Sequence, residues 1–446
     1  MSTSQIAWKP PEEWAEWAAW LSAALHGRHR WRLPVVLVGM LFAHGRRTVS
    51  SWLRAAGVSD DYQDYYYFIA KVGQEAKRIS SHLVMLLLKN LPLPERLVVV
   101  IDDTPTKRYG PRVEGASIHR NPTPGPADEN FLYGHIWVTI ALVIRHALWG
   151  AIALPLCALL YVRKEAMARL PEWRNWQFAT KLQLAAQLLG WLAPIIHAAG
   201  KKLWLVVDGG YASRQLLDEA RKLGVTVVGR LRKDAALCNL PPPGNAPKRG
   251  RPRKYGPKTI DLAKRAAQPR GWQQVDCLLY GKPATKTVKT FVATWKPARG
   301  PVRVVIVRET NRWIALFCTD IHAKVTDILE AYADRATVEQ NFHDLKEVWG
   351  AGQQQLRNIW ANIGAYHLNL WSYTLLEMWA WNRPHEELTD RSASPWDDPN
   401  RRPSHSDRRK ALQRYILGNE FSRLLGARWA STKIGALLLR LAALAA

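Results

Sequence analysis

The chain has 446 residues, and its 63 Lys and Arg residues outnumber its 37 Asp and Glu residues, which gives a formal net charge of +26. A chain of this length holds about two to four compact units and a large core, which excludes a small binding module. The charge attracts polyanions in a salt-dependent way, so nucleic acid is the leading class of partner.

An acidic membrane is the other partner that this charge admits, and it requires an amphipathic or spanning segment. The best spanning candidate, residues 135–162, is interrupted by Arg145, His146, Gly150 and Pro155. It is better read as two buried strands joined by a turn. The N-terminus lacks the basic start and apolar run of an export signal. We therefore expect a cytoplasmic protein with no membrane partner.

The cysteines stand singly, mostly inside apolar runs, without a CxxC motif or the spacing of a zinc site. We expect them in the core: Cys157, Cys238, Cys277 and Cys318. Most of the 22 tryptophans should serve packing as well, while a few could stack on bases.

In chain order, residues 12–90 read as helices with turn signals between them. An apolar helix before His44, a glycine-containing turn and a second helix that Gly57 could close resemble a helix-turn-helix. Three arginines there would suit phosphates or base edges: Arg46, Arg47 and Arg54. An ordinary helical bundle with basic surface residues explains the same pattern.

From Leu97 the spacing of apolar residues changes. The run LVVVIDDT predicts a buried strand with a carboxylate at its end. Only one of two adjacent strand residues can point into a site. We prefer Asp102 and keep Asp103 as the alternative. Strands at about 135–145 and 149–162 should follow, and then a long helix from about Ala179 to Ala199.

Residues 202–231 predict a strand, a glycine turn, a helix that Ser213 could cap and Gly224 could end, and another strand. Asp208 therefore stands at the end of a buried strand beside Gly209 and Gly210, where a metal or a phosphate can come close. Three strands, a helix, a strand and a late helix resemble the ribonuclease-H-like fold.

A proline- and charge-rich excursion at residues 238–258 is followed by strand-like runs up to Asp320, which predicts a β-rich insertion. Within it, KRGRPRKYG has the Gly-Arg-Pro core of an AT-hook, a basic segment that can lie in a narrow minor groove. The arginines concerned are Arg249, Arg251 and Arg253. A solvated basic loop is the alternative.

The stretch YADRATVEQNFHDLK, residues 332–346, is expected to be one helix with a polar stripe. At about 100° per residue, Tyr332, Glu339 and Lys346 fall near one line, with Arg335 about 40° to the side of Glu339. A solvated helix can carry such charges as surface pairs. The apolar flanks on both sides instead place the stripe against a core.

This spacing of Tyr, Arg, Glu and Lys resembles the YREK signature of DDE transposases from bacterial insertion sequences. The resemblance implies that Asp102, Asp208 and Glu339 hold two Mg²⁺ ions, for which Mn²⁺ would substitute; carboxylates and substrate phosphate are ligands that suit magnesium. It further implies that Tyr332, Arg335 and Lys346 bind phosphates near the cut. Family members stack a tryptophan on a base turned out of the duplex, and Trp313 holds the matching position. A core tryptophan is the alternative for Trp313.

The implied function is cleavage at transposon ends and strand transfer into target DNA. The partners would be double-stranded DNA and, on paired ends, a second copy of the chain, in the cytoplasm and nucleoid of a bacterium. An inactive DNA-binding derivative and a structure-directed nuclease of the same fold are the alternatives.

The expected fold class is α/β, a ribonuclease-H-like mixed sheet flanked by helices. After residue 346 we expect a tryptophan-rich helical core, and we expect residues 383–409 to be a flexible linker before a helical tail. The predicted divisions are a helical DNA-binding region at 1–90, the catalytic domain at 91–235 and 315–382, the β-rich insertion at 236–314, and the linker and tail at 383–446.

Overall fold

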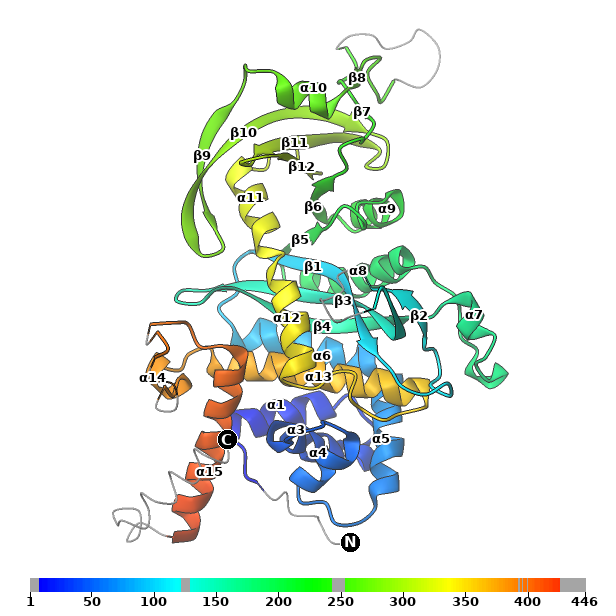
Figure 1. Ribbon diagram of the computed structural model, residues 1–446, viewed down its shortest axis with the longest axis vertical. Coiled ribbons are helices and arrows are strands. Elements are labelled where there is room, and N and C mark those ends of the chain that lie inside the picture. The colour runs from blue at the N-terminus through cyan, green and yellow to red at the C-terminus, as the bar shows by residue number, and fades with distance from the viewer. Residues whose placement is uncertain are drawn as a thin grey trace.

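The computed structural model describes residues 8–121, 129–242, 253–391, 394, 396–398 and 400–425. In these residues, twelve strands form one mixed sheet with helices against it and a helical body at one end (Figure 1). The arginines Arg249 and Arg251 of the AT-hook-like segment lie outside the described residues.

The part of the sheet that contains β1 and its neighbours has the strand order β4-β3-β1-β5-β6. Its strands β1 and β3 pair antiparallel, as do β3 and β4, whereas β1, β5 and β6 run parallel. This is the ribonuclease-H-like arrangement, as predicted. The bounds are β1 Arg96–Lys107, β3 Phe131–His146, β4 Gly150–Tyr161, β5 Lys202–Val207 and β6 Thr226–Leu231, with β2 Ser117–Arg120 at the edge beside β3.

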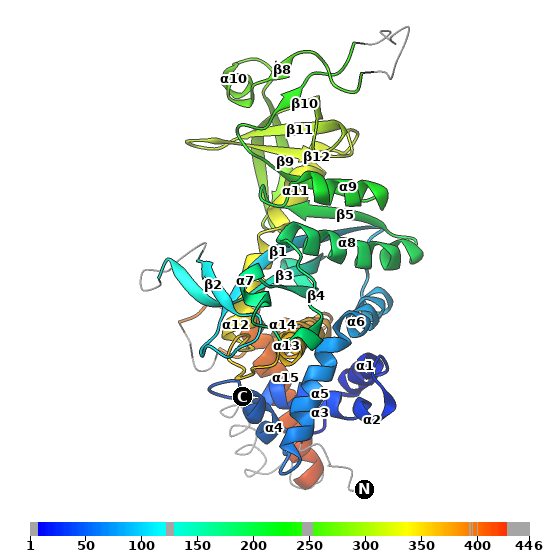
Figure 2. The ribbon, with the colours of Figure 1, turned by 90° about the vertical axis from the view of Figure 1, so that its right-hand side faces the viewer.

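Helices cover both faces of this part of the sheet (Figure 2). On one face lie α8 (Lys181–Ala198), begun by a Thr180 capping box, and α9 (Arg214–Lys222), capped by Ser213. On the other face lie α11 (Val325–Asp334) and α12 (Thr337–Glu347). Two short elements precede α8, namely α7 (Lys164–Met167) and the 3₁₀ helix η1 (Glu172–Arg174).

The predicted β-rich insertion continues the same sheet. Its strand β12 pairs antiparallel with β6, and β11 and β10 follow in order. Phe317 of β12 lies opposite Gly229 of β6 in this pairing. The insertion is therefore attached to β6, which is the neighbour of β5, the strand that precedes Asp208. The elements are β7 Leu237–Cys238, β8 Thr259–Ile260, α10 Leu262–Ala267, β9 Gln273–Leu279, β10 Lys282–Trp295, β11 Gly300–Arg308 and β12 Trp313–Cys318.

The prediction of one helix over residues 332–346 is wrong in one respect, because the segment breaks at Arg335 and Ala336. The N–H groups of Val338 and Glu339 bond three residues back, each at 3.1 Å, which tightens the chain into a 3₁₀ turn. Arg145 bonds the Asp334 carboxylate at 2.7 Å and so holds the end of α11 from the neighbouring strand. Tyr332 therefore belongs to α11, while Glu339 and Lys346 share α12.

The N-terminal helices pack on the long helix α13 (Ile359–Ala380), which is buried along nearly its whole length. Gly45 and Gly57 both have positive φ, which agrees with the predicted glycine turn and with the predicted end of the second helix. The helices are α1 Glu12–Ser22, α2 Gly27–Arg30, α3 Arg32–Phe42, α4 Val49–Ala55, α5 Tyr62–Gln74 and α6 Ala76–Asn90.

The predicted flexible linker over residues 383–409 is wrong for its last part. After the short helix α14 (His385–Leu388), α15 (His405–Leu425) begins inside that range. Arg408 bonds the buried Glu377 carboxylate at 2.6 Å, and Arg409 donates to the carbonyls of Leu41 in the last turn of α3 and of Ala43 just after it. Burial alone would raise the pKa of Glu377, but Arg408 and His405 lower it to about 2. These buried contacts order the segment, and its polar composition gave no indication of them.

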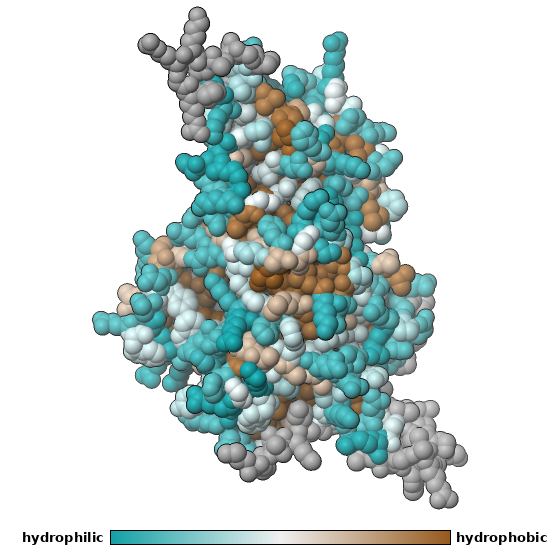
Figure 3. All heavy atoms as spheres, turned by 180° about the vertical axis from the view of Figure 1, so that it is seen from behind, coloured by the Kyte–Doolittle hydropathy of each residue, from teal (hydrophilic) through white to brown (hydrophobic). Residues whose placement is uncertain are grey.

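No helix among the described residues has the length and apolar character needed to cross a membrane. The face seen from behind is mostly hydrophilic, with hydrophobic patches across its middle and smaller ones toward its top (Figure 3). Of the four cysteines, Cys157 and Cys318 are buried and the other two are half-buried, and all four are free thiols.

Helices α5 and α13 touch through glycines, which gives a test of how the N-terminal helices are joined to the body. A Cβ on Gly73 would stand 1.9 Å from the Trp360 carbonyl oxygen. Overpacking of this kind costs about 1–3 kcal/mol. We expect Gly73→Ala to lower the free energy of unfolding by about that much in urea titrations. The control Gly27→Ala, with nothing within 4 Å of its Cβ, should change little. Equal stability of the two variants would contradict this packing.

Candidate active site

The parallel ladder between β1 and β5 places two aspartates side by side. The last paired residues are Val100 and Val206. Asp102 lies two residues beyond on β1, and Asp208 lies two residues beyond on the chain leaving β5. Because both strands run in the same direction, the two carboxylates reach the same edge of the sheet. The charge of Asp208 is one of the influences on the pKa of Asp102.

Asp102 sits in a setting that opposes its charge. Burial raises its pKa to about 6, and the charges of Asp208 and Asp103 act in the same direction. Two hydrogen bonds work against this rise: the Asp103 N–H donates to Asp102 Oδ1 at 2.8 Å, and Arg335 donates to Oδ2 at 3.0 Å. The site therefore has an excess of negative charge near Asp102, which a cation would relieve.

The glycine turn fixes Asp208. Its Oδ1 accepts hydrogen bonds from the N–H groups of Gly210 at 2.9 Å and Tyr211 at 3.0 Å. The side chain is thus held by its own backbone turn, a common use of aspartate after a strand. This leaves a half-buried carboxylate with a set direction at the end of β5.

Asp103 has a different set of partners. Lys181, at the start of α8, bonds its Oδ2 at 2.6 Å, and the Tyr211 hydroxyl donates to its Oδ1 at 2.7 Å. Tyr211 thereby ties β1 to the Asp208 turn. Sequence reasoning missed both Tyr211 and Lys181, although the place of Tyr211 three residues after Asp208 was a usable signal. These contacts favour Asp102 as the ligand, which remains a prediction.

Glu339 reaches this cluster through Arg335. The guanidinium that bonds Asp102 also lies 3.4 Å from Glu339 Oε1, and Glu339 is 66% exposed. Arg335 lies over the Tyr332 ring at 5.7 Å, and the nearby charges of Asp208 and Arg230 act on the Tyr332 hydroxyl. The exposed Arg230, on the strand beside Asp208, is a further cation that sequence reasoning missed.

Several predicted site residues lie apart from this cluster. Lys346 is at the far end of α12, where burial lowers its pKa and Lys107 is close. Trp313 starts β12 with Lys233 at 5.5 Å from its ring. Of the predicted arginines in the N-terminal helices, Arg46 and Arg54 are exposed, whereas Arg47 is half-buried. Arg253 is exposed in the insertion.

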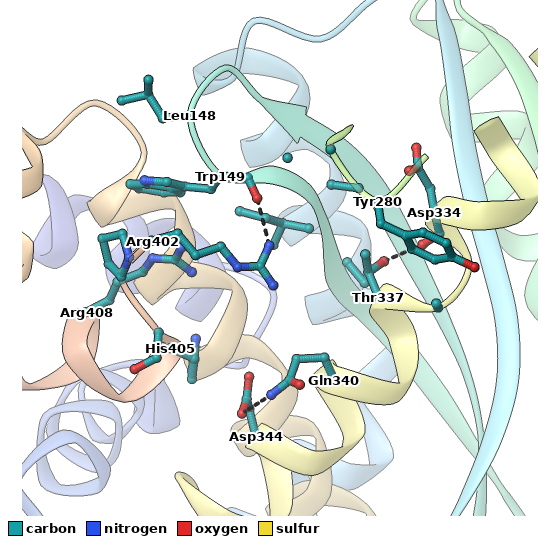
Figure 4. Close-up of a pocket in the computed structure, with 18 of the residues that line it drawn as sticks. Leu148, Trp149, Tyr280, Asp334, Thr337, Gln340, Asp344, Arg402, His405 and Arg408 are labelled. Carbon is teal, nitrogen blue, oxygen red and sulfur yellow. Dashed lines mark hydrogen bonds between the residues drawn. The ribbon is translucent and has the colours of Figure 1, made fainter. Parts of the chain in front are cut away.

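A cavity of about 620 Å³ on the opposite side of α12 is separate from the acids. Thr337, Gln340 and Asp344 of α12 line it, together with Trp149 and Arg402 (Figure 4). Gln340 donates to Asp344 at 2.9 Å, and Arg402 donates to the Trp149 carbonyl at 2.7 Å. None of Asp102, Asp208 and Glu339 lines this cavity. We therefore associate the cavity with the packing of α12 and not with the candidate active site.

The acids fit a divalent metal in part. In the described residues, no three Asp, Glu, His or Cys side chains converge as a complete metal site. Asp102 and Asp208 do supply hard oxygen atoms where negative charge is in excess, and this donor set suits magnesium or manganese. Arg335 stands between Asp102 and Glu339. A metal ion would have to replace its guanidinium there to contact both carboxylates.

A ribonuclease-H-like sheet with an aspartate at the end of each of two neighbouring parallel strands is an arrangement compatible with metal-dependent nucleases. Residues 21–297 match the family described as DDE superfamily endonuclease, and the chain belongs to this family. Its members generally use divalent metal ions and act on DNA. A comparison with curated proteins gave no match. Glu339 lies beyond the matched residues.

The raised pKa of Asp102 gives a test of its environment in the metal-free protein. The pKa of Asp102 is about 6 in the folded state, above the ordinary value of 3.8. The contribution of protonated Asp102 to the free energy of unfolding is therefore fully present below pH 3.8 and is lost as the pH rises through 6. Asp102→Asn should therefore leave stability nearly unchanged near pH 4 and raise it by about 3 kcal/mol near pH 7.5.

Thermal unfolding in EDTA at the two pH values measures this difference. As a control, Asp103→Asn weakens the bonds to Lys181 and Tyr211, and we expect it to lower stability at neutral pH. An Asp102→Asn variant whose stability relative to wild type is the same at both pH values would refute the raised pKa.

Proposed function

We propose that this protein is a DNA transposase of the insertion-sequence type, which cuts at the ends of its element and joins the freed 3′-ends to target DNA. The observation that carries the proposal is the contact of Arg335 with both Asp102 and Glu339, at the sheet edge where Asp208 also stands. The resemblance to the YREK signature implied a common site for these residues, 237 positions apart from first to last.

Asp102, Asp208 and Glu339 would hold the metal ions, with Mg²⁺ as the physiological ion and Mn²⁺ as a substitute. Bound in pairs, such ions supply activation of water or a 3′-hydroxyl on one side of the phosphorus and stabilisation of the leaving oxygen on the other. Asp103 acts indirectly, since Lys181 and Tyr211 use it to fix β1 against the Asp208 turn.

The cations beside the acids would bind the substrate. The Arg335 guanidinium offers a fork that fits two phosphate oxygens as well as it fits carboxylates. Tyr332 and Arg230 are close to it, since the charges of Arg335, Arg230 and Asp208 all act on the Tyr332 hydroxyl. Positive charge here offsets the repulsion between the DNA backbone and the carboxylates.

Trp313 and the more distant arginines enter the proposal through the family resemblance. Trp313 starts the insertion strand that pairs with β6, so it belongs to the same region of the sheet as Asp208. In the proposal it stacks on a base turned out of the duplex, Arg54 and Arg253 contact phosphates, and two copies of the chain assemble on paired ends. A structure-directed nuclease would use the same acids but would not join ends.

Glu339→Gln tests the proposal. We expect cleavage and joining to fall about a hundredfold or more, because a bound metal ion contributes several kcal/mol of charge stabilisation. DNA binding should persist, since the substitution removes one negative charge and leaves every basic residue in place. The assay uses a plasmid that carries the terminal sequences flanking the coding region, with Mg²⁺, and scores cut and joined products on a gel.

Glu219→Gln is the matched control, because Glu219 is on α9, against the opposite face of the sheet from Glu339. It should keep full activity. Cleavage by Glu339→Gln at the wild-type rate would remove the assigned site. Cleavage by wild type without any joined product would favour the nuclease over the transposase.

A further inference from the structure

A basic groove extends from the far end of β1, the strand that carries Asp102. One part of about 1200 Å³ is lined by Lys107 and Lys346, and a second part of about 520 Å³ is lined by Arg112 and Arg357. The two parts share Arg46, Tyr109, Gly352, Gln353 and Gln355, so they form one continuous surface.

Buried hydrogen bonds from Arg108 build the floor of this groove. Arg108 donates to the carbonyls of Gly352 at 2.7 Å and Gln354 at 3.1 Å, and its Nε donates to His135 Nδ1 at 3.1 Å. Burial lowers the pKa of Arg108 to about 10, so it stays charged at neutral pH. Burial and Arg108 lower the pKa of His135 to about 3, so this ring is neutral and can accept the bond.

A second set of bonds joins the turn between α3 and α4 to the same floor. The buried Gln354 side chain donates to the carbonyls of Arg47 at 3.1 Å and Gly350 at 2.9 Å. Gln353 Oε1 accepts from the Arg47 N–H at 2.9 Å. Gly350 has φ of +71°, and a Cβ there would stand 2.7 Å from the Cβ of Arg47. Three segments distant in sequence are thus locked together, and the groove is preformed.

The walls carry two kinds of chemistry. Arg46, Arg112 and Arg357 are exposed cations that suit phosphates. Tyr109 is 75% exposed, far more than a packing residue needs, and the exposed amide of Gln355 lies in the same groove. The tyrosine hydroxyl and the side-chain amide are groups that can form hydrogen bonds to base edges in a duplex.

We propose that this groove binds the DNA duplex next to the cleavage site and reads its sequence through Tyr109 and Gln355, while Arg46, Arg112 and Arg357 hold the phosphates. The inference rests on the proposed function. Lys346 links the two sites, because it lies seven residues along α12 from Glu339, about 10 Å at 1.5 Å per residue. The α3–α4 turn would then contact DNA through Arg46 as one wall of a composite groove.

Fluorescence anisotropy with two labelled duplexes tests the groove, one duplex carrying the terminal sequence beside the coding region and one a scrambled version. All proteins carry Glu339→Gln so that no cutting occurs. The reading pair Tyr109→Ala with Gln355→Ala should weaken binding of the terminal duplex about tenfold or more and leave the scrambled duplex unchanged. The phosphate pair Arg112→Ala with Arg357→Ala should weaken both equally and reduce the slope of log K against log salt by about 2.

Lys222→Ala is the matched control, an exposed cation on α9, on the opposite face of the sheet, and it should bind both duplexes as the parent does. The groove is refuted if both pairs bind like Lys222→Ala. Its reading role is refuted if the first pair weakens both duplexes equally, and polyglutamate competing as well as the terminal duplex would show a general polyanion surface. These outcomes concern binding alone, so they are distinct from a failure of Glu339→Gln to abolish cleavage.

Discussion

The parallel pairing of β1 with β5 is the constraint on which the rest of the site depends. It brings Asp102 and Asp208, more than 100 residues apart in sequence, to one edge of the sheet. Burial raises the pKa of Asp102, and repulsion from the Asp208 and Asp103 carboxylates adds to the rise. Arg335 offsets it in the metal-free protein. A site with this charge pattern is suited to divalent cations and to a phosphate backbone that those cations accompany.

The surrounding elements fix this edge from three directions. Tyr211 and Lys181 converge on Asp103 and so hold β1, the Asp208 turn and α8 together. Arg145 holds the end of α11 through Asp334 and Glu330, just before the turn that presents Arg335. The insertion extends the same sheet through β12. Asp102 and Glu339 therefore rest on regular elements, while Asp208 is held by the turn that follows β5. The residue that joins Asp102 to Glu339 stands at a break between two helices.

Local signals allowed much of this to be predicted. The β-branched run before Asp102 predicted its strand, and the glycine turn, the Ser213 cap and Gly224 predicted the unit around Asp208. Non-local contacts decided what was missed. A distant arginine, Arg145, bonds Asp334 next to the break at Arg335, and α15 begins inside a polar segment where Arg408 and Arg409 bond buried acceptors in other helices. The bonds of Arg108 that shape the groove are equally absent from any local pattern.

The identity of the metal-binding carboxylates is the central claim, and anomalous X-ray scattering from Mn²⁺ in crystals of the protein with a terminal duplex tests it most directly. The account predicts manganese bound by Asp102, Asp208 and Glu339, with Arg335 moved from between the acids to a phosphate. Manganese bound by Asp103 in place of Asp102, or a site that excludes Glu339, would contradict it.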